Sequence, residues 1–213
     1  MMIAEDYNYT KHWDEKYKST NDEDLGWYEG SPEMTMKLVS KCKLAEDAKI
    51  LNVGAGTTTL IDTLIEEGYN NIIANDLSRV ALEKLDERIV NTYGYNLKCI
   101  TDDLTNPTRL NKLTNVDLWI DRAVLHFFLE KDEQQAYFDL VKQTISKGGF
   151  VLIAVFALDG APKCCNLDLK RYDIDMLQEQ LGEEFQLVDA FNHTFINPRG
   201  GERPYIYTLF QRQ

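Results

Sequence analysis

The sequence predicts a doubly wound α/β fold with a mostly parallel sheet that ends in an antiparallel hairpin. Two observations lead to this prediction. Short apolar runs alternate with amphipathic stretches along most of the chain, and two β-rich runs joined by a loop with Pro and Gly follow at its end. Strands that alternate with helices form right-handed βαβ units, which give a parallel sheet covered on both faces.

Five apolar runs are expected to form the parallel strands. They are rich in Ile, Val and Leu, and none alternates cleanly between apolar and polar residues, as is typical of strands buried on both faces. The runs are KILNV (49–53), NIIAN (71–75), LKCI (97–100), VDLWI (116–120) and FVLIAVF (150–156).

Three amphipathic stretches between these runs are expected to be helices, because their apolar residues recur at spacings of three and four. In the second stretch Val80, Leu82, Leu85 and Ile89 form the apolar stripe, and Ser78 is expected to cap its first turn. The stretches are TTTLIDTLIEEG, SRVALEKLDERIV and EKDEQQAYFDLVKQTISKGG.

Helical segments are also expected before the first strand. One covers Tyr9–Tyr17, and a second, PEMTMKLVSKCKL, has Pro32 near its first turn. At the other end, FQLVDAFNH and RPYIYTLFQ are expected to pair as the hairpin. The length of 213 residues suits a single domain, with residues 1–45 as an N-terminal cap or lid and residues 46–213 as the core.

Composition excludes several classes of protein. The formal net charge is −12, which argues against a nucleic-acid binder. No apolar run is long enough to cross a bilayer and the N-terminus lacks a signal-peptide pattern, so we expect a cytoplasmic protein with reduced thiols and no membrane partner. The cysteines Cys42, Cys99, Cys164 and Cys165 match no common zinc spacing, and no metal is expected. The oligomeric state is left open.

The carboxyl ends of the first three strands carry the features of a nucleotide site, where ligands bind in doubly wound sheets. Gly54 and Gly56 allow a sharp turn and a close approach of the backbone to a ligand. Asp76, at the end of the second strand, can accept hydrogen bonds from both ribose hydroxyls. Asp103 can take the amino group of an adenine while Leu104 packs on its face. Two glycines alone are weak evidence, but the four features in register predict a nucleotide cofactor.

The glycine loop helps to choose between two cofactors. A dinucleotide fingerprint requires GxGxxG, but here Thr59 occupies the position of the last glycine. A glycine-poor loop and a terminal hairpin favour S-adenosylmethionine, which has no phosphates to bind. A nicotinamide-dependent oxidoreductase is the alternative.

The sequence resembles the class I S-adenosylmethionine-dependent methyltransferases along most of its length. The matching motifs are ILNVGAG, NDLS, DDLT, VDLWIDRAVLHFF and KGGFVLIAVF. The resemblance implies a Rossmann-like, seven-stranded sheet with a reversed last strand. The acid that often precedes the first glycine is an asparagine here. The cofactor-binding residues implied are Asn52, Gly54, Ala55, Gly56, Asp76, Leu77, Asp103, Leu104, Asp121 and Trp27.

HWDEKY and LGWYEGSPEMTMKLV resemble a group of methyltransferase-like enzymes that includes lysine methyltransferases acting on elongation factor and citrate synthase. Those lysine enzymes carry Asp-Lys-Gly-Thr, one residue and then Asp after the fourth strand. This chain has Asp121-Arg-Ala-Val-Leu-His126 there. We therefore expect transfer to a nitrogen, oxygen or sulfur atom of a small molecule, with a protein lysine as the alternative. A non-catalytic nucleotide-binding or interaction module is a further alternative.

The chemistry is an in-line displacement, so the protein mainly aligns acceptor and donor. Asp121 and His126 follow the fourth strand and are the leading candidates for a group that removes a proton from the acceptor. The structural alternatives are a packed histidine at position 126, and an Asp121 that holds a helix N-terminus or pairs with Arg122.

Two further groups of residues have open interpretations. Trp13, Tyr17, Trp27 and Tyr28 either close over a ligand or seal one end of the sheet. The adjacent Cys164–Cys165 pair, near the ligand end, either binds a soft metal or metalloid acceptor or consists of uninvolved loop thiols.

Overall fold

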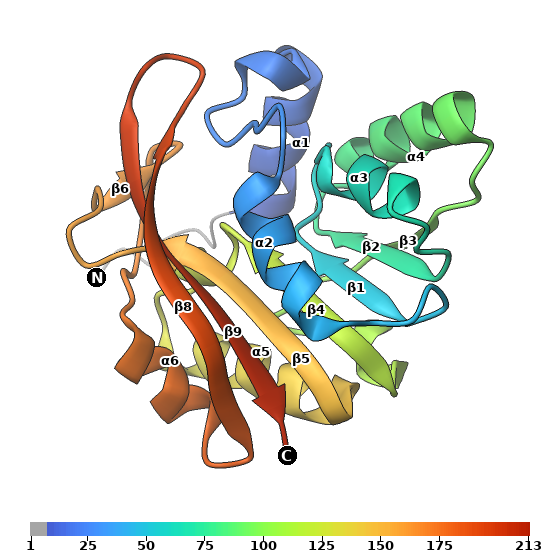
Figure 1. The fold of residues 1–213 in the computed structure, drawn as a ribbon. Helices are drawn as coiled ribbons and strands as arrows, with labels where there is room; N and C mark the ends of the chain where they lie inside the picture. Colours follow the sequence, from blue (N-terminus) through green and yellow to red (C-terminus); the bar gives the residue numbers. More distant parts are fainter. Residues whose placement is uncertain (1–7) are drawn as a thin grey trace.

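The computed structural model describes residues 8–213, and a seven-stranded sheet runs through its centre (Figure 1). The strand order is β3-β2-β1-β4-β5-β9-β8. Only β9 runs against its neighbours: it pairs antiparallel with both β5 and β8, and the remaining pairs are parallel. This confirms the predicted fold class. The strands are β1 (Ile50–Val53), β2 (Ile72–Asp76), β3 (Lys98–Thr101), β4 (Val116–Arg122), β5 (Ile145–Phe156), β8 (Phe185–Ile196) and β9 (Glu202–Arg212).

Helices cover both faces of the sheet, as a doubly wound fold requires (Figure 1). On one face α2 (Glu33–Cys42), α3 (Leu60–Glu66) and α4 (Arg79–Tyr93) bury their apolar sides, for example Leu38 and Leu85, against strand residues such as Ile50. On the other face α5 (Lys131–Thr144) and α6 (Ile174–Leu181) enclose Trp119 and Tyr137. The N-terminal helix α1 (Tyr9–Ser19) lies beside α4, within the segment that the sequence analysis interprets as a cap.

Local signals explain where the helices begin and end. The Ser78 hydroxyl accepts a hydrogen bond from the Ala81 N–H, which confirms the predicted cap of α4. The same helix ends at Gly94 in the left-handed conformation. Glu130 and Glu133 form a reciprocal capping box at the start of α5, which satisfies backbone N–H groups that have no partner within the helix.

Several features of the fold differ from the sequence prediction, among them a short hairpin at residues 163–168 that it does not contain. Strand β5 begins at Ile145 instead of Phe150, because Ile145 pairs with Val116 before the register shifts to Phe150 and Leu118. The sequence analysis also missed α6, a helix of 8 residues whose only clear start signal is the Asp173 cap. Short helices bury few apolar residues, so their periodicity is weak.

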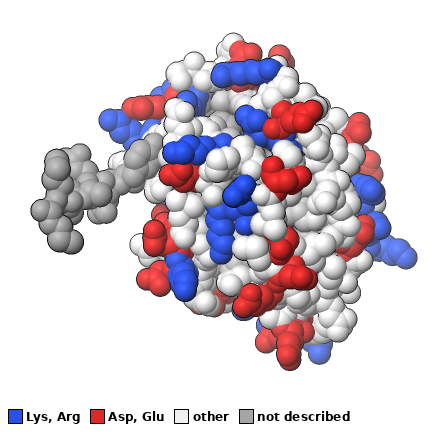
Figure 2. Space-filling model, turned by 90° about the vertical axis from the view of Figure 1, so that its left-hand side faces the viewer, with Lys and Arg blue, Asp and Glu red and all other residues white. Residues whose placement is uncertain are grey.

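The charged side chains are interspersed on the face drawn in Figure 2, where no continuous basic surface forms. None of the helices within residues 8–213 has the length and apolar character that crossing a bilayer requires.

Candidate functional site

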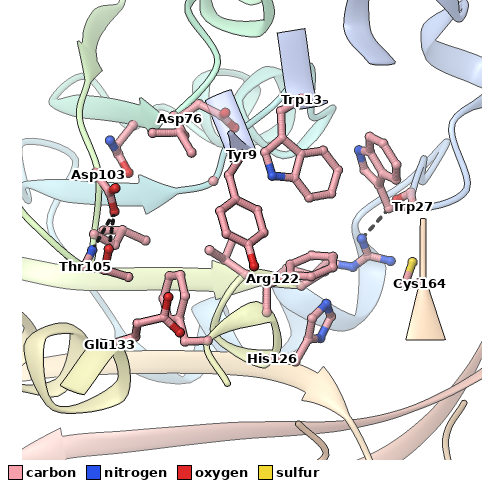
Figure 3. Close-up of a pocket in the computed structure, with 18 of the residues that line it drawn as sticks. Tyr9, Trp13, Trp27, Asp76, Asp103, Thr105, Arg122, His126, Glu133 and Cys164 are labelled. Atoms are coloured by element: carbon pink, nitrogen blue, oxygen red, sulfur yellow. Dashed lines mark hydrogen bonds between the residues drawn. The ribbon is translucent and has the colours of Figure 1, made fainter. Parts of the chain in front are cut away.

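A cavity opens at the carboxyl ends of the parallel strands, where the loops after β1, β2, β3 and β4 meet the N-terminal cap (Figure 3). Its empty space, counted out to the open mouth, is about 1090 Å³. The predicted site residues in its wall are Trp27, Gly54, Asp76, Leu77, Asp103, Leu104 and His126. The structure therefore brings together seven predicted residues that are far apart in the sequence.

The two glycines after β1 are required by close packing. Both have positive φ, 55° at Gly54 and 54° at Gly56, which glycine adopts without strain. A Cβ atom at Gly54 would overlap the side chain of Val124, and one at Gly56 would overlap the hydroxyl of Tyr17. Gly54 thus lies in the cavity wall, whereas Gly56 lies outside it and lets α1 pack against the loop.

Asp76 connects the glycine loop to the start of α4. One carboxylate oxygen accepts the Gly56 N–H at 2.8 Å and the other accepts the Ser78 N–H at 2.8 Å. Burial raises the pKa of Asp76 to about 6, although these backbone hydrogen bonds oppose the shift. The carboxylate holds the loop in place and still borders the cavity, beside Leu77.

The two acids after β3 have different roles. Asp102 accepts hydrogen bonds from the N–H groups of Thr108, Arg109 and Leu110, so it shapes the following loop. Among residues 8–213 Asp103 accepts local bonds alone, from the Thr105 N–H and hydroxyl, and its carboxylate lies at the cavity (Figure 3). Leu104 is buried in the same wall.

A second, smaller cavity adjoins the first, and Trp27, Gly54 and Arg122 border both. The predicted residues Asn52 and Ala55 lie here and not in the large cavity. The Asn52 side-chain nitrogen donates to the Ile120 carbonyl at 3.2 Å, and the side-chain oxygen has no hydrogen-bond partner among residues 8–213. Two other atoms that border this cavity share that property: the Thr35 hydroxyl and one terminal nitrogen of Arg122.

Asp121 does not lie in either cavity. Its fully buried carboxylate accepts the Val124 and Leu125 N–H groups at 2.9 and 3.1 Å and the Tyr137 hydroxyl at 2.7 Å. Burial raises its pKa to about 6. Two of these bonds hold the turn after β4 and the third ties it to α5, so the described contacts of Asp121 are structural, and its contact with cofactor or acceptor stays a prediction. Asp121 is a positioning residue for the turn that carries His126.

The sequence predicts for Arg122 only a possible pairing with Asp121, and the structure gives it a larger role. It pairs with Glu29 at 2.8 Å, and donates to the Trp27 carbonyl at 3.0 Å and the Tyr207 hydroxyl at 3.3 Å. The side chain thereby joins the N-terminal loop to β4 and β9. A basic residue at the end of a mostly buried strand is the signal in the sequence.

His126 is buried in an aromatic environment at the cavity wall (Figure 3). Its ring lies 4.6 Å from that of Phe127 and 4.9 Å from that of Phe156. Neither ring nitrogen has a hydrogen-bond partner in the part of the chain that the structure describes. Burial, with a smaller contribution from the Arg122 charge, lowers the pKa of His126 to about 3, so the imidazole is neutral at neutral pH.

This shifted pKa makes a testable prediction for stability. The pKa of His126 is lower in the folded than in the unfolded state, so the unfolded state binds more protons between pH 6.5 and about 3. The wild type should therefore lose about 3 kcal/mol more than His126→Phe between pH 7 and pH 4, at about 1.4 kcal/mol per pH unit. Urea unfolding at both pH values measures this difference.

The control His193→Gln changes a half-buried residue and should follow the wild type. An identical pH dependence in His126→Phe would contradict the assignment.

Aromatic side chains of the cap close one side of the cavity. The Trp13 ring lies 5.6 Å from that of Trp27 and 5.2 Å from that of Phe127, both in edge-to-face geometry. Trp13, Tyr17 and Trp27 border the large cavity and Tyr28 borders the small one. These positions fit the lid interpretation, and the same contacts also seal that end of the sheet.

This sheet order, with one reversed strand and a cavity beyond the ends of β1 to β4, is the fold of the class I S-adenosylmethionine-dependent methyltransferases. An S-adenosylmethionine-dependent methyltransferase from Anabaena variabilis has the same fold, with a TM-score of 0.76 and 13% identity over 98% of this chain and 96% of that one. A structure from a study of the conversion of a disulfide bond into a thioacetal group in echinomycin biosynthesis gives a TM-score of 0.76 and 18% identity over 96% and 93%.

A third structure is the 1,6-didemethyltoxoflavin-N1-methyltransferase of Burkholderia thailandensis, with bound 1,6-didemethyltoxoflavin and S-adenosylhomocysteine. It gives a TM-score of 0.65 and 17% identity over 85% of this chain and 77% of that one.

Two curated proteins resemble the chain in sequence. EEF1A lysine methyltransferase 2 of Danio rerio is 24% identical over 67% of this chain, and the Mus musculus protein of the same name is 30% identical over 53%. The matches span 66% and 49% of those proteins, so less than two thirds of either relative is covered. No model of a known protein family matches the sequence.

Proposed function

We propose that the chain is an S-adenosylmethionine-dependent methyltransferase that transfers a methyl group to a nitrogen, oxygen or sulfur atom of a small molecule. The observation that carries this proposal is the pair of adjoining cavities at the class I site, one suited to a nucleoside and the other to an amino acid. S-adenosylmethionine joins a nucleoside to an amino acid and carries no phosphate.

The large cavity supports the nucleoside end. Asp76 and Asp103 are carboxylates on neighbouring loops that can accept the ribose hydroxyls and the adenine amino group, and Leu104 supplies an apolar surface for the base. Figure 3 places both acids on one side of the pocket.

The small cavity supports the methionine end. Its buried polar atoms without partners among the described residues are two donors, on Arg122 and Thr35, and one acceptor, on Asn52. Buried polar groups normally have hydrogen-bond partners, so these atoms need an explanation. The carboxylate of a methionine would accept from the two donors, and its ammonium would donate to the acceptor.

The opposite side of the large cavity, which we call the acceptor end, supports a small-molecule acceptor. We define it by Arg122, His126, Phe156, Cys164, Arg203 and Tyr205, which Figure 3 in part shows opposite the two acids. Arg122 is already paired with Glu29, and Glu133 lies in the same cavity wall, so the support for a small molecule comes from the rings and not from net charge. Phe156 and Tyr205 offer apolar surfaces on which a flat aromatic compound would pack. The lysine methyltransferases among the relatives keep a protein lysine as the second candidate.

In this proposal the protein aligns the acceptor for in-line attack on the methyl carbon of the sulfonium. His126 is the residue that would touch the acceptor, because its ring nitrogens have no other partner within residues 8–213. With a pKa near 3 the imidazole is a weak base at neutral pH, so it would orient the acceptor through a hydrogen bond.

Calorimetric titration with S-adenosylmethionine and S-adenosylhomocysteine tests the cofactor. We expect micromolar binding of both ligands and no change in the fluorescence of reduced nicotinamide cofactors. Absence of binding would refute the proposal. Labelled methyl transfer to a small-molecule library and to elongation factor then separates the two acceptors, and binding without transfer to any acceptor would favour a non-catalytic module.

A further inference from the structure

A short hairpin at the acceptor end holds two thiols side by side. It consists of β6 (Lys163–Cys164) and β7 (Leu167–Asp168), joined by Cys165 and Asn166. Both turn residues have positive φ, 54° and 67°, as a two-residue type I′ turn requires. Asparagine is common in this conformation, whereas cysteine adopts it at a cost, so the turn keeps a strained residue that a glycine would relieve.

The turn brings the two sulfur atoms to 3.7 Å from each other without a disulfide bond. The hydrogen bond between the two thiols, together with the Arg203 charge, lowers the pKa of Cys164 to about 7 against the effect of burial. A thiolate is the form of cysteine that attacks electrophiles and binds metals.

The spacing fits two thiolates on one soft centre. Two sulfurs that each lie about 2.3 Å from a pyramidal centre, with an angle near 95° between the bonds, are about 3.4 Å apart, so the observed 3.7 Å needs only a small rotation of the thiols to close on it. Within residues 8–213 no group of three His, Cys, Asp or Glu side chains could hold a metal ion. A structural zinc ion, which needs four ligands, is therefore not supported. A centre that takes two sulfurs and keeps a substituent of its own fits better.

The surroundings suggest what that substituent is. Cys164 lies in the cavity wall together with His126, Phe156 and Tyr205, whose rings pack on one another. Figure 3 shows the Cys164 thiol on the same side of the pocket as Arg122 and His126. An aromatic substituent on the bound atom would have these rings beside it.

We propose that Cys164 and Cys165 form a dithiol site for monosubstituted trivalent arsenicals with an aromatic substituent. With an arsine oxide, two S–As bonds form, two S–H bonds break and the As–O bonding is lost. The oxygen leaves as water with both thiol protons, and arsenic stays trivalent. The reaction needs no oxidant or reductant, and it does not depend on methyl transfer.

Titration of the reduced protein with phenylarsine oxide tests the site. Intact-protein mass spectrometry should show one adduct with the mass of the reagent less one water. The adduct should persist in excess 2-mercaptoethanol and be removed by 2,3-dimercaptopropanol. Cys164→Ser and Cys165→Ser should each bind about 100-fold more weakly, because the second bond to a chelated ligand closes within one molecule. The matched control Cys42→Ser/Cys99→Ser should bind as the wild type does.

Several outcomes would overturn the proposal. These are an adduct that 2-mercaptoethanol removes, an unchanged affinity in Cys165→Ser, or an adduct mapped by proteolysis to a peptide without residues 164 and 165. The peptide map uses the wild type and so does not depend on the folding of a variant. Failure of S-adenosylmethionine to bind would refute the proposed function and leave this result intact.

Discussion

Replacing Asp76 with alanine is expected to lower the affinity for S-adenosylmethionine about 100-fold. A hydrogen bond to a charged group contributes about 1.5–3 kcal/mol, and each 1.4 kcal/mol is a factor of ten. The variant also loses the acceptor for the Gly56 and Ser78 N–H groups, so the glycine loop loosens. Calorimetric titration measures the affinity, and Asp139→Ala, on the exposed side of α5, is the control for loss of a surface charge. Unchanged affinity in a folded Asp76→Ala protein would refute the assignment.

The substitution Asp76→Asn removes the negative charge of the side chain and keeps its size and shape. The pKa of Asp76 is raised by burial to about 6 in the folded state, against about 3.9 in the unfolded chain, so the folded state binds more protons in this range. Stability is therefore lost as pH rises from about 4 to 6, by about 3 kcal/mol for this group. Asp76→Asn should lack that loss, and urea unfolding at pH 4 and pH 7 measures it. Cofactor affinity of the wild type should rise through the same range as the carboxylate forms.

Replacing Arg122 with methionine is expected to have the second large effect, a loss of about 3–5 kcal/mol in unfolding free energy. The change leaves the Glu29 carboxylate buried without its cation, since only 13% of that side chain is accessible. It also frees the Trp27 carbonyl, so the cap should detach from the sheet and cofactor affinity should fall.

A double-mutant cycle with Glu29→Gln tests the cause. If the unpaired carboxylate is responsible, Arg122→Met should be much less destabilising in the Glu29→Gln background. Equal losses in both backgrounds would mean that the packing of Arg122 against Phe195 and Tyr205, and not its ion pair, stabilises the cap.

The parts of the fold that the sequence predicted correctly depend on strong local signals. Strands such as β1 and β4 are rich in Ile, Leu and Val, and α4 has both a Ser78 cap and a glycine end. The early start of β5 depends on a pairing between Ile145 and Val116 that only the assembled sheet provides. Local patterns do not contain such long-range contacts.

Site residues could be predicted where their position at the end of a strand places them at the cavity. They could not be predicted where the direction of the side chain depends on packing. Asp76 and Asp103 lie where the strand pattern placed them. Asp121 follows a strand in the same way, but its side chain points into the core and bonds to Tyr137, a residue from a distant helix. The importance of Arg122 arises from partners on the cap and on β9, none of them adjacent in sequence.

The position of β9 in the sheet has a consequence for how the protein is made. Strand β9 is the last strand in the sequence but lies inside the sheet, between β5 and β8. During synthesis β8 leaves the ribosome first and has no neighbour to pair with until β9 emerges. This half of the sheet must therefore form after β9 has been synthesised, and β5 and β8 expose unpaired edges in the interval, when such edges promote aggregation.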